Sequence, residues 1–141
     1  MDVKFMKRNI FQRIFGVSET KKPEVADCWD YEDGKLVINL NQASELRVPG
    51  GAIRLEGDKL PARVLVVCGE NGEYRAYRNQ CTHFGHRRLD PVPGTNTVQC
   101  CSINKSTFDS DGNQVFGPAP HSIKSYPVEK NQDKLSILIS K

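Results

Sequence analysis

Short apolar stretches separated by turn residues dominate the chain from residue 35 onward. Residues 35–40 read Lys-Leu-Val-Ile-Asn-Leu, and residues 52–55 alternate apolar with small or polar side chains. Residues 63–68 contain a continuous apolar run of strand length, which is typical of a strand buried on both faces. A Gly-containing turn at 69–72 leads into an aromatic alternation over 73–78, so these stretches predict a β-hairpin.

The same pattern continues towards the C-terminus. Residues 98–100 and 106–108 predict short strands, and a turn follows at 109–113. Residues 126–129 and 134–139 predict a last hairpin. Many short strands with turns at this spacing indicate an all-β sandwich or small barrel.

The first sixteen residues have a different pattern and predict a short basic helix. Lysines and arginines are interspersed there with a loose apolar stripe made of Phe5, Met6, Ile10, Phe11, Ile14 and Phe15. Such a helix suits weak docking to a membrane surface or to a partner protein. The stripe has no sustained period, however, which favours a helix that packs on its own domain or frays.

A polar stretch over 18–27, which contains Pro23, predicts a linker. We therefore expect two parts, an N-terminal basic helix and linker over 1–34 and a β-domain over 35–141. Because the strand pattern starts only near residue 35, the sequence alone predicts that residues 1–15 are dispensable for folding.

Composition and charge are those of an ordinary globular domain. The length of 141 residues suffices for one domain with a hydrophobic core, and 38% of the residues are hydrophobic and 26% charged. Residues 1–22 have a net charge of +4 from six basic and two acidic side chains, which leaves −1 for the rest of a chain whose total is +3. That balance excludes the basic face on which nucleic-acid binding depends.

No apolar run reaches the length of a membrane span, and no signal peptide pattern follows the start. We therefore expect a cytoplasmic chain whose five cysteines are reduced. The odd number of cysteines also argues against a disulfide framework. Cys28 and Cys68 are interpreted as small buried hydrophobic residues.

Candidate metal ligands are concentrated in two short stretches. Cys81 and His83 are two residues apart, and seventeen residues separate His83 from Cys101. Thiolate is the soft ligand that iron–sulfur clusters and zinc select, and imidazole is its usual partner. The chain contains no Cys-x-x-Cys pair, which argues against a zinc site built from two such pairs.

These stretches resemble the Rieske family, whose cluster site reads Cys-x-His and, after about sixteen residues, Cys-x-x-His. The resemblance extends over about residues 36–139. It includes Phe108-Asp109 before a Gly-containing turn and the segment Gly117-Pro118-Ala119-Pro120, which in that family covers the cluster loops. It implies a Rieske-type antiparallel β-sandwich or small barrel with a two-loop cluster-binding subdomain, and a [2Fe–2S] cluster as cofactor.

The resemblance also implies a ligand set. Cys81 and Cys101 would hold one iron, and His83 would be one of two ligands to the other. Asn104 occupies the fourth position, where the family has histidine, and its amide is a neutral oxygen donor that suits cluster iron poorly. Three alternatives stay open for this fourth ligand: Asn104 itself or a water, His86, and Cys100, although Cys100 faces away from its neighbour on an extended strand.

The function implied is one-electron transfer between partner redox proteins, a reductase and an acceptor. We expect an electron-transfer component of an oxidoreductase system rather than a stand-alone catalyst. The alternative is a Rieske-fold binding or structural module that holds no cluster, or a mononuclear metal at Cys81, His83 and Cys101.

Overall fold

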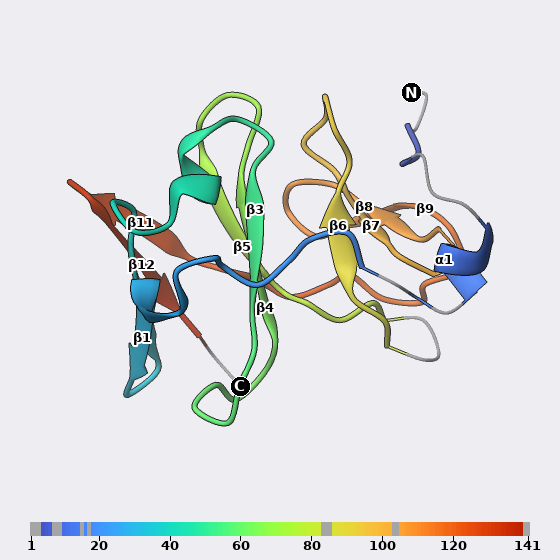
Figure 1. The fold of residues 1–141 in the computed structure, drawn as a ribbon. Coiled ribbons are helices and arrows are strands. Elements are labelled where there is room, and N and C mark those ends of the chain that lie inside the picture. The colour runs from blue at the N-terminus through green and yellow to red at the C-terminus, as the bar shows by residue number, and fades with distance from the viewer. Residues whose placement is uncertain are drawn as a thin grey trace.

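The computed structural model describes residues 4–6, 10–14, 16, 18–82, 86–102 and 105–139. The described chain is nearly all β, which confirms the predicted fold class. Its strands form three antiparallel sheets of four strands each (Figure 1). Among these residues, no helix is long and apolar enough to cross a membrane.

The first sheet joins the start of the β-domain to its end. Its order is β1-β2-β12-β11, and its strands are β1 (Trp29–Glu32), β2 (Lys35–Asn39), β12 (Lys134–Leu138) and β11 (Val128–Asn131). Asp33 and Gly34 connect β1 to β2 with φ of 50° and 82°, the left-handed pair that a tight two-residue hairpin turn requires. Strand β1 lies within the segment that the sequence assigns to the N-terminal helix and linker, so residues 29–32 belong to the folded sheet.

The second sheet contains the predicted central hairpin. Its order is β10-β5-β4-β3, and its strands are β10 (Ser125–Tyr126), β5 (Tyr74–Arg78), β4 (Val64–Cys68) and β3 (Ala52–Leu55). All five residues of β4 are buried, as the continuous apolar run predicts. Side chains from the first and second sheets form one core, which includes Leu36, Ile38 and Val66.

The third sheet carries the two stretches with candidate ligands. Its order is β6-β7-β8-β9, and its strands are β6 (Leu89–Pro91), β7 (Val98–Cys100), β8 (Thr107–Phe108) and β9 (Gln114–Phe116). In the chain it is inserted between β5 and β10, and in space it lies beside the second sheet, with helix α1 (Ile10–Ile14) at its outer side (Figure 1). A second apolar core joins the two sheets and includes Leu65, Tyr77 and Phe108.

Short 3-10 helices complete the described structure. Helix η1 (Ala26–Cys28) precedes β1, and η2 (Ser44–Arg47) lies between β2 and β3. Cys28 and Cys68 are both buried, in keeping with their interpretation as core residues.

Tyr77 links the second sheet to the third sheet, and its burial should make the folded protein less stable at alkaline pH. Its hydroxyl donates a hydrogen bond to the Ser110 carbonyl at 2.7 Å, and burial raises its pKa from 10 to about 12. Below pH 10 this tyrosine is neutral in both folded and unfolded chains, whereas between pH 10 and 12 only the unfolded chain ionises. The free energy of unfolding should therefore fall with pH across this window.

Tyr77→Phe tests this linkage. The variant should lose about 1 kcal/mol at neutral pH with the hydrogen bond, but it should lose less further stability than wild type between pH 10 and 12. Urea unfolding at a series of pH values measures both effects. Parallel pH profiles for the two proteins would contradict the assignment.

Candidate metal centre

The first candidate ligand loop begins where β5 ends. Cys81 is 1% exposed, and its amide donates to the carbonyl of Arg87 at 2.8 Å. The Asn79 side chain accepts the amide of Leu89 at 2.7 Å, which ties the end of β5 to the start of β6. His83 lies in residues 83–85, outside the described residues.

The second loop begins where β7 ends. Cys101 is 2% exposed, and its amide donates to the carbonyl of Arg88 at 3.1 Å. The adjacent residues 87 and 88 thus accept one backbone amide from each cysteine loop. This arrangement brings Cys81 and Cys101 to the same end of the third sheet. Asn104 lies in residues 103–104, outside the described residues.

Cys100 and Cys101 have different surroundings. The side chain of Cys100 belongs to the second apolar core, and its sulfur lies 3.1 Å from the hydroxyl of Ser102. The Cys101 thiol instead donates to the carbonyl of Gly16, at 3.2 Å. Neighbouring side chains at the end of a strand are thus directed to different faces.

Burial controls the protonation of Cys101. Desolvation is the main cause that raises the pKa of its thiol to about 11, and Cys100 and Asp90 add to the rise while Arg87 opposes it. At neutral pH the metal-free thiol is protonated. Metal binding must therefore release this proton, since thiolate is the form that binds metal.

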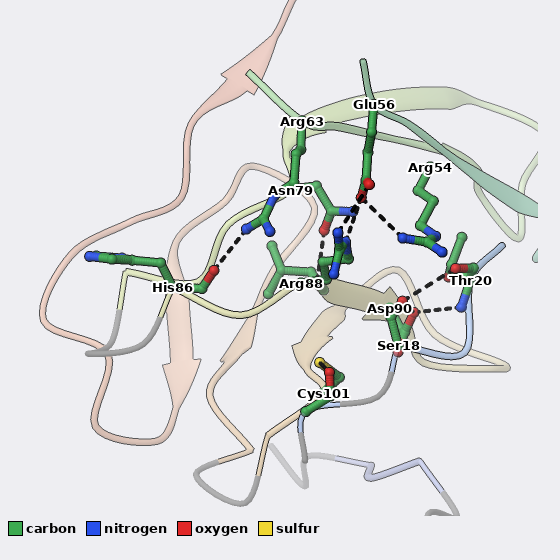
Figure 2. Close-up of polar contacts among 12 residues, drawn as sticks. Ser18, Thr20, Arg54, Glu56, Arg63, Asn79, His86, Arg88, Asp90 and Cys101 are labelled. Carbon is green, nitrogen blue, oxygen red and sulfur yellow. Dashed lines mark hydrogen bonds and ion pairs between the residues drawn. The ribbon is translucent and has the colours of Figure 1, made fainter. Parts of the chain in front are cut away.

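An ion pair positions the backbone between the two loops. The guanidinium of Arg88 makes two contacts with the Glu56 carboxylate, one of them at 3.0 Å, and this pairing lowers the pKa of Glu56. Arg54 contacts the same carboxylate at 3.2 Å (Figure 2). Arg63 donates to the carbonyl of His86 at 2.7 Å. Arg88 therefore holds residues 86–88 against the second sheet.

His86 and His121 border a cavity of about 240 Å³ beside Cys81. The His86 ring has its Nδ1 3.1 Å from the Cys81 carbonyl oxygen, and Figure 2 shows it pointing away from Cys101. His121 comes from the segment after Pro120, and its carbonyl accepts the hydroxyl of Thr82 at 2.6 Å. The position of His121 directly after the proline-bearing segment predicts a surface histidine near the site.

The proline-bearing segment packs on the end of the second loop. Gly117 has a φ of 94°, and a Cβ at this position would lie 2.6 Å from the Cα of Ser106, so only glycine fits. The amide of Ala119 donates to the Ser106 hydroxyl at 3.2 Å. The segment therefore contacts both loops, through Ser106 and through Thr82.

The N-terminal segment also packs on this end of the molecule. Asp90, which is 1% exposed, accepts the Ser18 hydroxyl at 2.9 Å and the Thr20 amide at 2.8 Å (Figure 2). Arg13 is 4% exposed and donates to the carbonyls of Cys100 at 3.3 Å and Ser102 at 3.2 Å. Helix α1 therefore contacts its own domain through Arg13, while the apolar side chains of Ile10, Phe11 and Ile14 stay exposed.

The described donors fit half of the predicted site. Within the described ranges, no three His, Cys, Asp or Glu side chains gather closely enough to hold a metal ion. Cys81 and Cys101 supply two buried thiols on adjoining loops, which suits the cysteine-held iron of a cluster. The full ligand set, Cys81, His83, Cys101 and a fourth group, stays a prediction.

Comparisons with known proteins agree with this arrangement. The model of the Rieske [2Fe-2S] domain family matches residues 37–127, which include both loops and the proline-bearing segment. No curated protein matches the chain.

Solved structures share the fold. One is the apo form of the quaternary ammonium Rieske monooxygenase CntA, with a TM-score of 0.53 and 22% identity. The match covers 69% of this chain but only 31% of the CntA chain, so this protein corresponds to about a third of the length of CntA. The ferredoxin of carbazole 1,9a-dioxygenase from Nocardioides aromaticivorans IC177 has a TM-score of 0.55 and 17% identity, with 74% of this chain and 95% of that chain covered.

A third similar structure comes from the complex of reduced oxygenase and oxidized ferredoxin in carbazole 1,9a-dioxygenase. It has a TM-score of 0.52 and 18% identity, and the match covers 66% of this chain and 84% of that chain.

Arg13→Met should destabilise the protein by about 3 kcal/mol. The substitution removes the guanidinium that donates to the carbonyls of Cys100 and Ser102 and, at 2.9 Å, to the side-chain oxygen of Gln99. Urea unfolding measures the loss. Arg47→Met, at an exposed position of η2, is the matched control and should leave stability nearly unchanged. Equal stability of wild type and Arg13→Met would instead support the expectation that residues 1–15 are dispensable.

Proposed function

Because the chain belongs to the Rieske [2Fe-2S] domain family, we propose that it is a one-electron carrier that receives an electron from a reductase and passes it to an acceptor protein. The observation that carries this proposal is the pair of buried cysteines, Cys81 and Cys101, on loops that flank one backbone segment. The family's cofactor, a [2Fe–2S] cluster, would supply a one-electron couple at this position.

Four groups would hold the cofactor. Cys81 and Cys101 would bind one iron, and His83 and a fourth ligand the other. The chain would stabilise the bound form through backbone hydrogen bonds that fix both cysteine loops and through the positive charge of Arg87, which acts on the Cys101 sulfur. Burial of both thiols keeps water from these ligands.

The surroundings of Cys100 and His86 disfavour both as ligands, so we infer that Asn104 is the fourth ligand. The thiol of Cys100 is directed into the apolar core, where it contacts Ser102. The His86 ring contacts the Cys81 carbonyl and points away from Cys101. Asn104 is at the family's own ligand position in the sequence, and a water on the iron would complement its weak oxygen donor.

Two findings support the proposed partners and compartment. One similar structure is part of a complex of an oxygenase with its ferredoxin, which supports an oxygenase-like protein as acceptor for this chain. None of the five cysteines, all of which lie within the described residues, is part of a disulfide, which supports a reducing compartment such as the cytoplasm. The alternative is a binding or structural module with a mononuclear metal or without metal, favoured only by the replacement at Asn104.

Metal analysis of cysteine variants tests the function and the ligand set together. Wild type should be coloured and contain two irons and two acid-labile sulfides per chain. Cys81→Ser and Cys101→Ser should each lose both, while Cys28→Ser and Cys68→Ser serve as buried-cysteine controls and should retain them. Full retention in Cys100→Ser would support the core position of that thiol. A colourless wild type with zinc, or with no metal, would contradict the carrier function.

The pH dependence of the reduction potential tests the fourth ligand. An imidazole bound to iron has a distal N–H that becomes more acidic when the iron is oxidised, so each such ring couples one proton to reduction. With His83 alone, the potential should fall with pH by no more than about 59 mV per unit. Asn104→His should add a second proton and a steeper segment.

His86→Ala is the control for this titration. If wild type already shows a two-proton slope that His86→Ala removes, His86 is the ligand and the assignment to Asn104 is wrong. Protein-film voltammetry between pH 6 and 11 provides both slopes.

A further inference from the structure

Helix α1 is oriented with its charged residue inward and its apolar residues outward. Arg13 is only 4% exposed, whereas Ile10 is 59%, Phe11 69% and Ile14 49% exposed. A helix that only covered its own domain would have the opposite arrangement, because apolar side chains gain free energy by leaving water.

The contacts of Arg13 fix this orientation. Its guanidinium donates to the carbonyls of Cys100 and Ser102 and to the side-chain oxygen of Gln99. Rotation of the helix to bury its apolar face would withdraw the guanidinium from these buried acceptors. The outward direction of Ile10, Phe11 and Ile14 is therefore a built-in property of the fold.

Two aromatic rings extend the exposed apolar area. Phe5 and Phe116 are each 43% exposed, and their ring centroids lie 4.9 Å apart in an edge-to-face contact. Strand β9, which carries Phe116, is an edge strand of the third sheet, and Arg13 of α1 donates to the carbonyl of Met6, the neighbour of Phe5, at 3.3 Å. We define the outer apolar patch as Phe5, Ile10, Phe11, Ile14 and Phe116.

Basic groups accompany this patch. The Lys105 ammonium lies 5.5 Å from the centre of the Phe5 ring, and Lys4 is the neighbour of Phe5 in the chain. In the sequence, residues 3–18 contain four basic and no acidic residues, and Glu19, the next residue, lines one hollow with Lys4 and Phe5. The surface thus combines exposed Phe and Ile side chains with positive charge.

We propose that the outer apolar patch docks the protein on an anionic lipid membrane surface. Interfacial helices typically combine exposed Phe and Ile with lysines and arginines. The apolar side chains enter the headgroup region, and anionic lipids attract the basic groups. Charge complementarity therefore points to negatively charged lipid. Five side chains that are about half exposed supply roughly 500 Å², less than the roughly 800 Å² per partner of a stable protein interface, which disfavours a second copy of the chain.

Docking through this patch would place the candidate metal centre close to the lipid. Arg13 connects α1 directly to the second loop, so the loop and the patch belong to one packed unit. A carrier held there would meet partners at the membrane surface. The docking itself does not require the proposed electron-carrier function, and its test measures lipid binding rather than redox chemistry.

Vesicle co-sedimentation with the full chain tests the proposal. Wild type at low salt should bind vesicles of phosphatidylcholine with phosphatidylglycerol and release from them at high salt, because salt screens the attraction. It should bind vesicles of phosphatidylcholine alone much more weakly. Phe11→Ser and Ile14→Ser should each weaken binding about tenfold, through the lost burial of one large apolar side chain.

Leu138→Ser is the matched control, because Leu138 is 56% exposed on β12 in the first sheet, away from the patch. This variant should bind vesicles like wild type, and circular dichroism should show all three variants folded. Equal binding to neutral and anionic vesicles, equal loss in Leu138→Ser, or no binding by wild type would overturn the proposal. A concentration-dependent dimer that Phe11→Ser disrupts, without vesicle binding, would assign the patch to a second copy instead.

Discussion

The carbonyls of Arg87 and Arg88 are the point on which the candidate metal centre depends. One accepts the amide of Cys81 and the other the amide of Cys101, so two adjacent residues hold both cysteine loops. The ion pair between Arg88 and Glu56 anchors that segment to the second sheet. The first core and the site are thereby connected through charged groups as well as through apolar packing.

Two segments outside the third sheet pack on it, the N-terminal segment and the proline-bearing segment. The proline-bearing segment closes one side through Gly117 and Ala119, and the N-terminal segment closes another through Arg13 and Asp90. On the N-terminal side, Arg13 donates to the backbone carbonyls of Cys100 and Ser102. A two-loop site needs such donors, because loops leave backbone carbonyls that no strand satisfies.

The sequence predicted the elements whose burial follows a regular pattern. Strand β4 and the hairpin to β5 follow from an apolar run and a turn. The last hairpin was predicted over 126–129 and 134–139; it forms between β11 and β12, whereas Tyr126 pairs with β5 as part of β10 in the second sheet. Strands β1 and β6 were not predicted, because Trp29–Glu32 and Leu89–Pro91 are short and contain charged residues whose pairing depends on distant strands.

The inward position of Arg13 had no signal in the sequence. An arginine in an amphipathic stretch normally indicates the solvent side, and buried acceptors that include the carbonyls of Cys100 and Ser102 reverse this expectation. For the metal centre, the motif identified Cys81 and Cys101 as a pair, and the structure brings their loops to one backbone segment. The hydrogen bond between Thr82 and His121 joins residues 39 apart in the chain, and no local pattern predicts this contact.

The most direct test of the central claim is a Mössbauer spectrum of the ⁵⁷Fe-enriched protein after one-electron reduction. A cluster with two cysteines on one iron and nitrogen or oxygen ligands on the other has chemically unequal irons. Two doublets of equal area should appear, one ferric with sulfur ligation and one ferrous with nitrogen or oxygen ligation. Two irons with the same all-sulfur ligation, or a spectrum without a [2Fe–2S] cluster, would contradict the account.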